Sequence, residues 1–369
     1  MTIVHVLEPF SSGVTTAVIS IAKALPEYPH IVIHGSRNWT ESAEKVKLRF
    51  PSGVVFIEWK NAGRELNPIK DWKAYWDLVS LLKKYKKSND TVIHLHSSKA
   101  GFLGRLACRF IGIKNVIYTP HCGAFLRKDI GIFKRKLYRF LEWLGGCFGG
   151  RVSGCGPSEG ELYKKLGKNT VYVSNGVNII NMEPGIINDD DRLKRNLISF
   201  TGIASVQKDP AMWSAIACEC YKMAHENGFS FCWIGDGPLA DKIDRGCVDV
   251  TGWKSASDVE ALLDNTSVYF SSSAWEGLPY GVLEAMAHGC AVLLRDVPGN
   301  RDLVSSGENG YLFKTEKEAQ EHLNNMLKDR NLLAGMGMKS IEIVKNDFSI
   351  KKMGDGYRKF YKETVEGNI

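Results

Sequence analysis

The alternation of short apolar runs with amphipathic segments of helical length constrains the fold of this chain most strongly. In the first half, runs rich in β-branched residues cover residues 3–7, 31–33, 54–57, 92–95, 116–118 and 171–173. The pattern begins again after a polar stretch, with runs at residues 197–200, 231–234, 248–250, 268–270 and 291–294. Such alternation is typical of parallel sheets covered by helices on both faces. We therefore predict an α/β chain with two Rossmann-like, doubly wound parallel-sheet domains.

The polar stretch at residues 181–196 is the predicted connection between the domains. It contains Pro184 and Gly185 and then an acidic run at residues 188–191, which is the composition of a hinge. A chain of 369 residues also exceeds the usual size of a single core. We place the domains at residues 1–182 and 183–369, with the last helix a candidate to cross back to the first domain. Ligands bind beyond the carboxyl ends of parallel strands, so the predicted site is a cleft faced by both domains.

Composition limits where the chain works and what it binds. With 44% hydrophobic and 24% charged residues it resembles an ordinary globular protein, and no run approaches the ~18 apolar residues of a membrane span. Met1 leads directly into a strand-like run, and the nine cysteines are scattered without a Cys-x-x-Cys pair. These features predict a cytoplasmic location and reduced thiols, with neither a disulfide framework nor a zinc site.

Two carboxylates in the run AWEGLPYGVLEAMAHGC indicate a binding site. Glu276 and Glu284 are separated by seven residues, with Pro279 placed to begin a helix and Gly289 to end it. The free N–H groups of the first helical turn would favour a phosphate, and the carboxylates would accept hydrogen bonds from sugar hydroxyls. Each glutamate taken alone has a plainer interpretation, as an acid early in a helix or in a loop. Together they favour a nucleotide-sugar pocket.

This run resembles the signature of the retaining GT-B glycosyltransferases of the group 1, family four clan. Four further segments agree with the resemblance: residues 12–14 after the first strand, the two histidines His96 and His121 at strand ends, residues 174–178, and the glycine turn at residues 235–239. The resemblance implies transfer of a sugar, with retention, from a nucleotide-diphosphate sugar to a hydroxyl acceptor, in bacterial polysaccharide or glycolipid biosynthesis. Residues 1–182 would then bind a glycan or lipid-linked acceptor, and residues 183–369 the donor.

The resemblance also assigns roles to single residues. Glu284 would hold the ribose, Glu276 the hydroxyls of the donor sugar, and Lys208 the diphosphate, while His121 would contact the transferred sugar. The catalytic set is therefore His121, Glu276 and Lys208. The other donor-binding residues would be Gly13, Gly202, Gly235, Gly237, Gly277, Leu278, Pro279 and Tyr280. No protein nucleophile, metal ion or cofactor is expected, because Lys208 would stabilise the charge that develops on the leaving diphosphate.

Two departures from the family pattern concern the phosphate site. Ile203 occupies the position at which the clan usually has an arginine, so Arg295 and Arg301 are candidate substitutes. A Gly-Gly turn near the donor is replaced by residues 298–301, in which Asn300 is a candidate donor to a sugar hydroxyl.

Residues 127–144 combine six basic side chains with apolar residues at helical spacing. Such a helix suits the anionic surface of a membrane that presents a lipid-linked acceptor. The alternative is a surface helix whose apolar stripe packs on its own sheet. The net charge of +7 is modest, and without a known nucleic-acid module we expect no binding to nucleic acid.

Three other functions remain open at this level. A GT-B sugar-nucleotide epimerase would share the fold and the donor, and a noncatalytic sugar-nucleotide-binding or scaffold subunit would explain the loss of the arginine at Ile203. An NAD-dependent oxidoreductase would need a Gly-x-Gly-x-x-Gly turn after the first strand, which the sequence lacks. The sequence sets neither the nucleotide base nor the sugar, the acceptor or the linkage.

Overall fold

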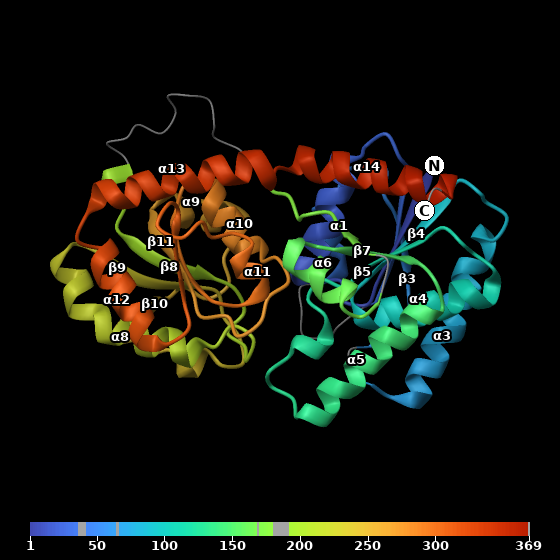
Figure 1. Ribbon diagram of the computed structural model, residues 1–369, viewed down its shortest axis with the longest axis horizontal. Coiled ribbons are helices and arrows are strands. Elements are labelled where there is room, and N and C mark those ends of the chain that lie inside the picture. The colour runs from blue at the N-terminus through green and yellow to red at the C-terminus, as the bar shows by residue number, and fades with distance from the viewer. Residues whose placement is uncertain (36–41, 64–65, 168–169, 180–191, 368–369) are drawn as a thin grey trace. The chain divides into compact units, whose positions relative to one another are not determined.

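The computed structural model describes residues 1–35, 42–63, 66–167, 170–179 and 192–367. The chain forms two compact units, which are Met1–Gly176 with Ile350–Ile369 and Val177–Ser349 (Figure 1). The domain boundary predicted near residue 182 lies outside the described residues, as does the acidic run at 188–191. The last helix, α14 (Ile350–Glu366), is grouped with the first unit.

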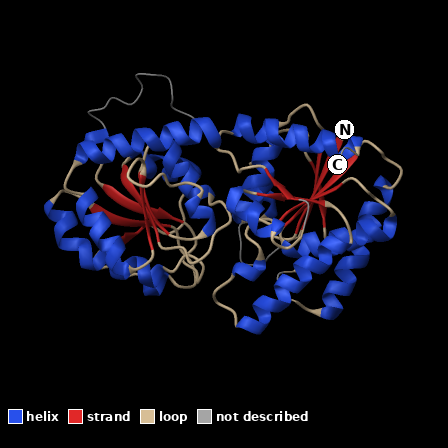
Figure 2. Cartoon of the chain, viewed as in Figure 1, coloured by secondary structure: helices blue, strands red, loops and turns tan. Residues whose placement is uncertain are grey.

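The first unit is built on a seven-stranded parallel sheet with the order β3-β2-β1-β4-β5-β6-β7. The strands are β1 (Thr2–Leu7), β2 (His30–His34), β3 (Val55–Glu58), β4 (Thr91–His96), β5 (Val116–Thr119), β6 (Arg151–Gly154) and β7 (Thr170–Tyr172). The helices, besides α14, are α1 (Ser12–Ala24), α2 (Ala43–Lys47), α3 (Pro68–Leu82), α4 (Ser98–Ile111), α5 (Ile132–Cys147) and α6 (Pro157–Lys164). Helices lie on both sides of the strands (Figure 2).

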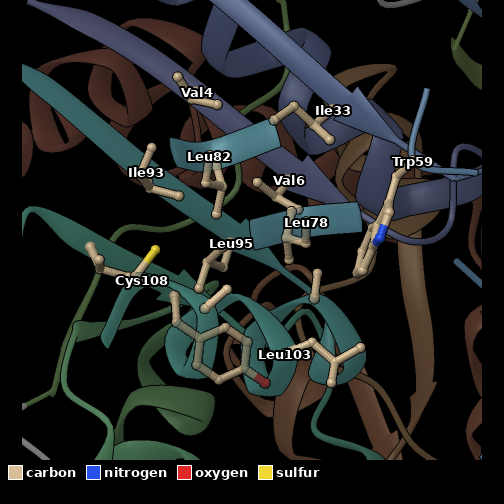
Figure 3. Close-up of a cluster of buried hydrophobic side chains, with 14 of the residues drawn as sticks. Val4, Val6, Ile33, Trp59, Leu78, Leu82, Ile93, Leu95, Leu103 and Cys108 are labelled. Carbon is tan, nitrogen blue, oxygen red and sulfur yellow. The ribbon is translucent and has the colours of Figure 1, made fainter. Parts of the chain in front are cut away.

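Two apolar layers hold this unit together. On one face of the sheet, Val6, Ile93 and Leu95 pack with Leu78 of α3 and Leu103 of α4 (Figure 3). On the other face, buried residues of β1, β4 and β5 pack with α1 and with the apolar stripe of α14, whose members are Met353, Tyr357, Phe360 and Tyr361. Helix α14 is therefore part of the core of the first unit.

The second unit has a six-stranded parallel sheet with the order β10-β9-β8-β11-β12-β13. Its strands are β8 (Leu197–Thr201), β9 (Ser230–Ile234), β10 (Val248–Val250), β11 (Thr266–Ser271), β12 (Ala291–Arg295) and β13 (Gly310–Phe313). Its helices are α8 (Pro210–Glu226), α9 (Ala256–Asp264), α10 (Tyr280–Ala287), α11 (Pro298–Arg301), α12 (Glu316–Met326) and α13 (Arg330–Asp347). The strand order reverses between β8 and β11, which is where doubly wound sheets bind ligands.

The predicted architecture of two doubly wound parallel sheets is confirmed. Strands β6 and β13 were missed, because each has only four residues and includes a glycine, which weakens the strand signal. All nine cysteines are free thiols. Across the described residues, no helix is both long and apolar enough to cross a membrane.

Candidate functional site

The second unit gathers charged side chains where its strand order reverses. Lys208 lies in the loop after β8, and Glu276 lies in the loop after β11. The Lys208 Nζ atom donates to Glu276 Oε1 at 2.5 Å. The Glu276 side chain is only 7% exposed and that of Lys208 is 22% exposed, so this ion pair is largely shielded from water. The structure thus brings together two of the three predicted catalytic residues.

Several hydrogen bonds join the two loops and hold this pair in place. The Ser272 hydroxyl donates to the carbonyl oxygens of Lys208 and Asp209, at 2.8 and 3.0 Å. Gln207 Nε2 donates to the Trp275 carbonyl at 3.0 Å and to Glu276 Oε2 at 3.3 Å. Asp209 adopts a left-handed conformation with φ of 50°, which is uncommon for a residue other than glycine. The loop that carries Lys208 is therefore fixed by its partners on the β11 side.

Three predicted glycines form the neighbouring turns after β8 and β9. Gly202, Gly235 and Gly237 have φ values of 151°, 142° and 157°. A Cβ atom on Gly235 would lie 2.2 Å from the Gly202 carbonyl oxygen, and one on Gly237 would lie 2.6 Å from the Ala204 oxygen. The glycines therefore let the two turns pack on each other, with the Gly202 N–H donating to the Ile234 carbonyl at 3.0 Å.

Helix α10 begins beside the ion pair. Pro279 is the N-cap and Tyr280 the first helical residue, one position later than predicted, while Gly289 follows the helix end with φ of 74°. The N-cap Pro279 offers no capping side chain, and the first N–H groups of a helix have no partner within the helix itself. A Cβ on Gly281 would lie 2.7 Å from Thr201 Oγ1, so the tight approach at this glycine is to β8.

The carboxylates of Glu276 and Glu284 both interact electrostatically with the Tyr269 phenol. Glu284 lies in the second turn of α10 and is half-buried. Burial raises the pKa of the Tyr269 phenol, and the charges of Glu284 and Glu276 raise it further. The Tyr269 hydroxyl is also within 2.9 Å of Thr201 Oγ1 at the end of β8. Both carboxylates are therefore within electrostatic range of the Tyr269 hydroxyl.

The loop of Gly277 and Leu278 is enclosed by the short helix α11. A Cβ on Gly299 would lie 2.0 Å from the Gly277 carbonyl oxygen. Asn300 in the same helix is fully buried and donates through Nδ2 to the Arg295 carbonyl at 2.9 Å. The amide group proposed for a sugar hydroxyl is thus engaged in closing this turn.

The candidate substitutes for the missing arginine both have acidic partners. Arg295 Nη1 lies 2.9 Å from Asp209 Oδ2 and 3.2 Å from the Ser272 carbonyl, and Arg301 pairs with Asp296. Arg295 therefore supports the loop of Lys208, and Arg301 is half exposed on α11. Ile203 itself lies against the Gly237 turn, with Cγ2 3.0 Å from the place of a Cβ on that glycine.

The first unit holds His121 at the corresponding edge of its sheet. His121 follows β5 and has φ of 52°, and the next residue, Cys122, has φ of 76°. Its Nε2 atom is 2.9 Å from His96 Nδ1, so the two predicted histidines are joined directly. Burial lowers the pKa of His121 to about 3. The imidazole is therefore neutral near pH 7.

Glu159 fixes the unusual backbone next to His121, and no sequence motif marks this residue. Its carboxylate accepts the Cys122 N–H at 2.6 Å and the Cys155 N–H at 2.9 Å, and its side chain is buried. Burial raises its pKa. In the sequence, an acid in the first turn of a helix that begins with Pro157 looks like an ordinary helix-start residue.

Gly13 and residues 174–178 were predicted from short motifs. Gly13 is exposed in the first turn of α1 after β1, so it belongs to a helix start rather than to a loop. At the end of the first unit, the Gly176 N–H donates to the sulfur of Met353 at 3.2 Å. That contact connects the motif to α14.

Helix α5 exposes its apolar residues. Phe133 is 85% exposed, and Ile132, Leu137, Phe140 and Trp143 are each about half exposed. The residues that α5 buries are Glu142 and Gly145. Glu142 accepts from the Tyr118 hydroxyl at 2.9 Å and pairs with Arg105 at 3.5 Å, which attaches the helix to β5 and α4. The apolar stripe is therefore not covered along its whole length, since Leu141 and Leu144 are half-buried whereas Phe133 is exposed.

Two family models match the chain, and their ranges lie mostly in different units. The model described as Glycosyltransferase Family 4 matches residues 11–180, and the model described as Glycosyl transferases group 1 matches residues 244–342. The second range includes the glutamate pair and α10. The loop of Lys208 lies between the two matched ranges.

Curated bacterial proteins resemble the chain over most of its length. The UDP-Gal:alpha-D-GlcNAc-diphosphoundecaprenol alpha-1,3-galactosyltransferase of Escherichia coli is 28% identical over 82% of this chain and 82% of its own. The N,N'-diacetylbacillosaminyl-diphospho-undecaprenol alpha-1,3-N-acetylgalactosaminyltransferase of Campylobacter jejuni is 26% identical over 76% of this chain and 78% of its own.

Solved structures share the fold. Anabaena HepE in complex with UDP and glucose superposes with a TM-score of 0.76 at 16% identity, covering 98% of this chain and 99% of its own. Sucrose-phosphate synthase from Thermosynechococcus elongatus gives 0.77 at 15% identity, with full coverage of both chains. At this identity the likeness is evidence for the GT-B fold alone.

Proposed function

We propose, from the premise that this chain belongs to the group 1 and family 4 glycosyltransferases, that it transfers a sugar with retention from a UDP-sugar to a lipid-linked glycan. The transfer would need no divalent metal ion or other cofactor. The observation that carries this proposal is the Lys208–Glu276 pair at the strand reversal of the second unit, with helix α10 beginning four residues after Glu276.

The charges at this position suit a nucleotide-diphosphate sugar. The Lys208 ammonium has three protons, of which Glu276 uses one, so the same group can also donate to phosphate oxygens. The first N–H groups of α10 favour an anion in the same region. Glu284 would accept hydrogen bonds from the ribose hydroxyls, and Glu276 from hydroxyls of the donor sugar. Leu278, Pro279 and Tyr280 would line that sugar.

We further propose that the transfer retains the anomeric configuration and needs no metal ion. Negative charge grows on the diphosphate as the glycosidic bond breaks, and a fixed cation stabilises it without a metal ion. We assign no protein nucleophile, and the leaving phosphate would accept the proton of the acceptor hydroxyl. Both relatives are named for alpha-1,3 linkages. Transfer with retention forms such a linkage when the donor sugar has the α configuration.

The acceptor proposal is supported by α5. Both relatives are named for acceptors that carry diphosphoundecaprenol, which is a membrane lipid. Helix α5 exposes Phe133, Phe140 and Trp143 together with the basic residues Lys134, Lys136 and Arg139. Aromatic and basic side chains on one helix suit an anionic lipid surface. We propose that the first unit docks there, on the cytoplasmic face.

Product analysis tests the reaction. Purified protein is incubated with a panel of UDP-sugars and GlcNAc-diphosphoundecaprenol, and the product is analysed by mass spectrometry and NMR. We expect one donor to be consumed, an α linkage to form, and the rate to persist in EDTA. A β linkage would contradict retention, and loss of rate in EDTA that added Mg²⁺ restores would contradict metal independence.

The same incubations separate the alternatives. Conversion of the donor sugar to its epimer without an acceptor would favour an epimerase. Donor binding without turnover in the presence of the acceptor would favour a noncatalytic subunit.

Vesicle binding tests the docking surface. Replacing Lys134, Lys136 and Arg139 with Ser should weaken binding to phosphatidylglycerol vesicles by about a hundredfold, at about 1 kcal/mol for each basic residue. The matched control replaces Lys351, Lys359 and Lys362 of α14. These lysines are exposed and carry the same total charge, but the aromatic residues of their helix are buried. Equal losses in the two variants would indicate net charge rather than a docking face.

A further inference from the structure

Four histidines of the first unit form a continuous chain of hydrogen bonds. His30 Nε2 lies 2.9 Å from the Leu25 carbonyl oxygen, and His30 Nδ1 lies 3.1 Å from His5 Nε2. His5 Nδ1 is 3.0 Å from His96 Nε2, and His96 Nδ1 is 2.9 Å from His121 Nε2. The chain therefore crosses the sheet from the end of α1 to the residue that follows β5.

Burial keeps these four imidazoles neutral. His5, His30 and His96 are at most 5% exposed. Loss of hydration lowers the pKa of His30, lowers the pKa of His5 and of His96 well below the usual value, and lowers the pKa of His121 to about 3. A neutral imidazole has one N–H donor and one acceptor nitrogen.

The Leu25 carbonyl oxygen then determines which nitrogen of each imidazole in the chain is protonated. The Leu25 carbonyl can only accept, so His30 Nε2 carries a proton and His30 Nδ1 is an acceptor. The acceptor on His30 requires a proton on His5 Nε2, and the same step repeats through His96 to His121. Each imidazole is thus the Nε2–H form. At the end of the chain, Nδ1 of His121 bears a lone pair, and no hydrogen bond among the described residues engages it.

A metal ion is the competing explanation for part of this cluster, because His5, His94 and His96 are close enough to bind one. All six of their ring nitrogens already have protein partners. His94 Nδ1 is 2.8 Å from the Tyr361 hydroxyl and His94 Nε2 is 2.9 Å from Thr119 Oγ1, while the nitrogens of His5 and His96 belong to the chain. Hydrogen bonding accounts for the cluster completely.

We propose that the Leu25 carbonyl, acting through His30, His5 and His96, fixes the tautomer of His121 so that Nδ1 accepts a hydrogen bond from a sugar hydroxyl. His5, His30 and His96 are then positioning residues, since they act through His121. The inference rests on the proposed function in one respect, which is that the partner of His121 is a hydroxyl of the transferred sugar. The tautomer itself follows from the hydrogen bonds alone.

The fixed tautomer of His121 has a consequence for donor-sugar specificity. An Nδ1 acceptor with a fixed lone pair favours a ligand group that can donate, and a hydroxyl can donate whereas a hydrogen or fluorine substituent cannot. Because the left-handed backbone at His121 and Cys122 is held by Glu159, the ring is constrained from both its backbone and its Nε2 side. The fixed tautomer therefore selects a hydroxyl at one position of the donor sugar.

Nitrogen NMR tests the tautomer without any substrate. Long-range ¹H–¹⁵N spectra of ¹⁵N-histidine-labelled protein at pH 7.5 should show protonated Nε2 and unprotonated Nδ1 for His121, assigned by comparison with His121→Gln. In His96→Leu, the acceptor for Nε2–H is lost, and the His121 nitrogens should move toward a mixture of tautomers. His96→Gln is the matched control, because its amide oxygen can still accept, and it should keep the parent pattern.

Three results would overturn the proposal. A protonated Nδ1 on His121 in the parent would contradict the chain directly, and an unchanged His121 pattern in His96→Leu would show that the chain does not set the tautomer. Histidine resonances that change on treatment with EDTA would indicate a bound metal ion instead. His30→Leu, which removes the acceptor for His5 Nε2–H at the far end of the chain, provides the same comparison if His96→Leu fails to fold.

Kinetics test the link to the sugar. For the donor that is consumed, His96→Leu should raise KM about tenfold or more, the effect of one lost hydrogen bond, and His96→Gln should change it less than threefold. Deoxy analogues of the donor sugar should abolish the difference between these variants at one ring position. A difference that persists with every analogue would refute the hydroxyl contact. If no donor is consumed, the proposed function fails, while the NMR result still decides the tautomer.

Discussion

Replacing Lys208 with Met, and then Glu276 with Gln in the same chain, separates the structural role of this ion pair from its role in transfer. In Lys208→Met the Glu276 carboxylate stays buried without its cation, and among the described side chains it keeps the 3.3 Å contact from Gln207. Removing one partner of a fully buried pair costs about 3–5 kcal/mol. Lys208 is 22% exposed and Gln207 compensates in part, so we expect a loss of about 2–3 kcal/mol in the stability of the second unit.

The double variant should regain much of this stability. With Gln at position 276 no buried charge remains, so we expect the coupling energy between the two substitutions to be about 1–3 kcal/mol. Native-state hydrogen exchange of peptides from β8 and β11 measures this in the second unit alone. A coupling energy below about 0.5 kcal/mol would refute the claim that the two side chains are paired in the folded chain.

Activity should not return with stability. Lys208→Met is expected to lower turnover at saturating donor by about a hundredfold, which is the effect of removing one group that stabilises developing charge. The double variant should remain at least as impaired, since Glu276→Gln also weakens the contact with the donor sugar. Turnover of Lys208→Met within about twofold of the parent would require another cation, and Arg295 would be the first to examine because it pairs with the adjacent Asp209.

Three further outcomes are expected. Glu284→Ala should weaken binding of free UDP about tenfold by loss of a charge-assisted hydrogen bond, measured by calorimetry, and unchanged affinity would refute the ribose assignment. Ile203→Arg in the Lys208→Met background should restore part of the turnover, because it places a guanidinium where the family pattern has one; no gain at all would show that position 203 does not face the diphosphate. The folded pKa of His121 is about 3 against 6.5 for the free side chain, so the unfolded state binds the proton first and stability falls as the pH drops below 6.5. At pH 5 this one group costs about 2 kcal/mol, and His121→Gln should flatten the dependence of Tm on pH.

The fold could be predicted because alternation is a local signal. Apolar runs such as residues 92–95 and 268–270 are too short for helices and rich in β-branched residues, and the segments between them have helical length. Strand β13, by contrast, begins at Gly310, which has a φ of 155° that favours glycine. Because Gly310 has no side chain, β12 can pack closely against it. A four-residue strand that begins in this way carries little β propensity.

The site could be predicted only where a short motif contains it. Glu276, Glu284 and the α10 start belong to one run of sequence, and the structure keeps them near one strand end. The histidine chain joins His5 to His96, which are 91 residues apart, and no local pattern relates them. The parallel pairing of β1 with β4 creates that contact. His5 lies opposite His94 in the register, and His96 is on the same face of the sheet two residues further along β4.

Helix α5 shows why periodicity could not choose between two surfaces. The apolar spacing of residues 130–144 predicts a face but not what covers it. The structure buries a carboxylate instead: Glu142 takes a hydrogen bond from Tyr118 and pairs with Arg105, and burial raises its pKa. A glutamate in a basic amphipathic helix is ordinarily assigned to the solvent side, so no pattern in the sequence indicated that Glu142 would be the buried residue.

His121 of the first unit and Lys208 of the second unit differ in charge near pH 7, so they are suited to different roles. An imidazole with a pKa of about 3 is neutral near pH 7, so His121 cannot supply positive charge to a leaving diphosphate. Lys208 is the proposed cation, because its ammonium lies beside Glu276 and has two further protons for other acceptors. His121 is then suited to accept a hydrogen bond from a neutral hydroxyl. Accordingly, His121→Gln should raise KM for the donor sugar while leaving the binding of free UDP unchanged, whereas Lys208→Met should weaken both UDP binding and turnover. Equal loss of UDP affinity in the two variants would contradict this division.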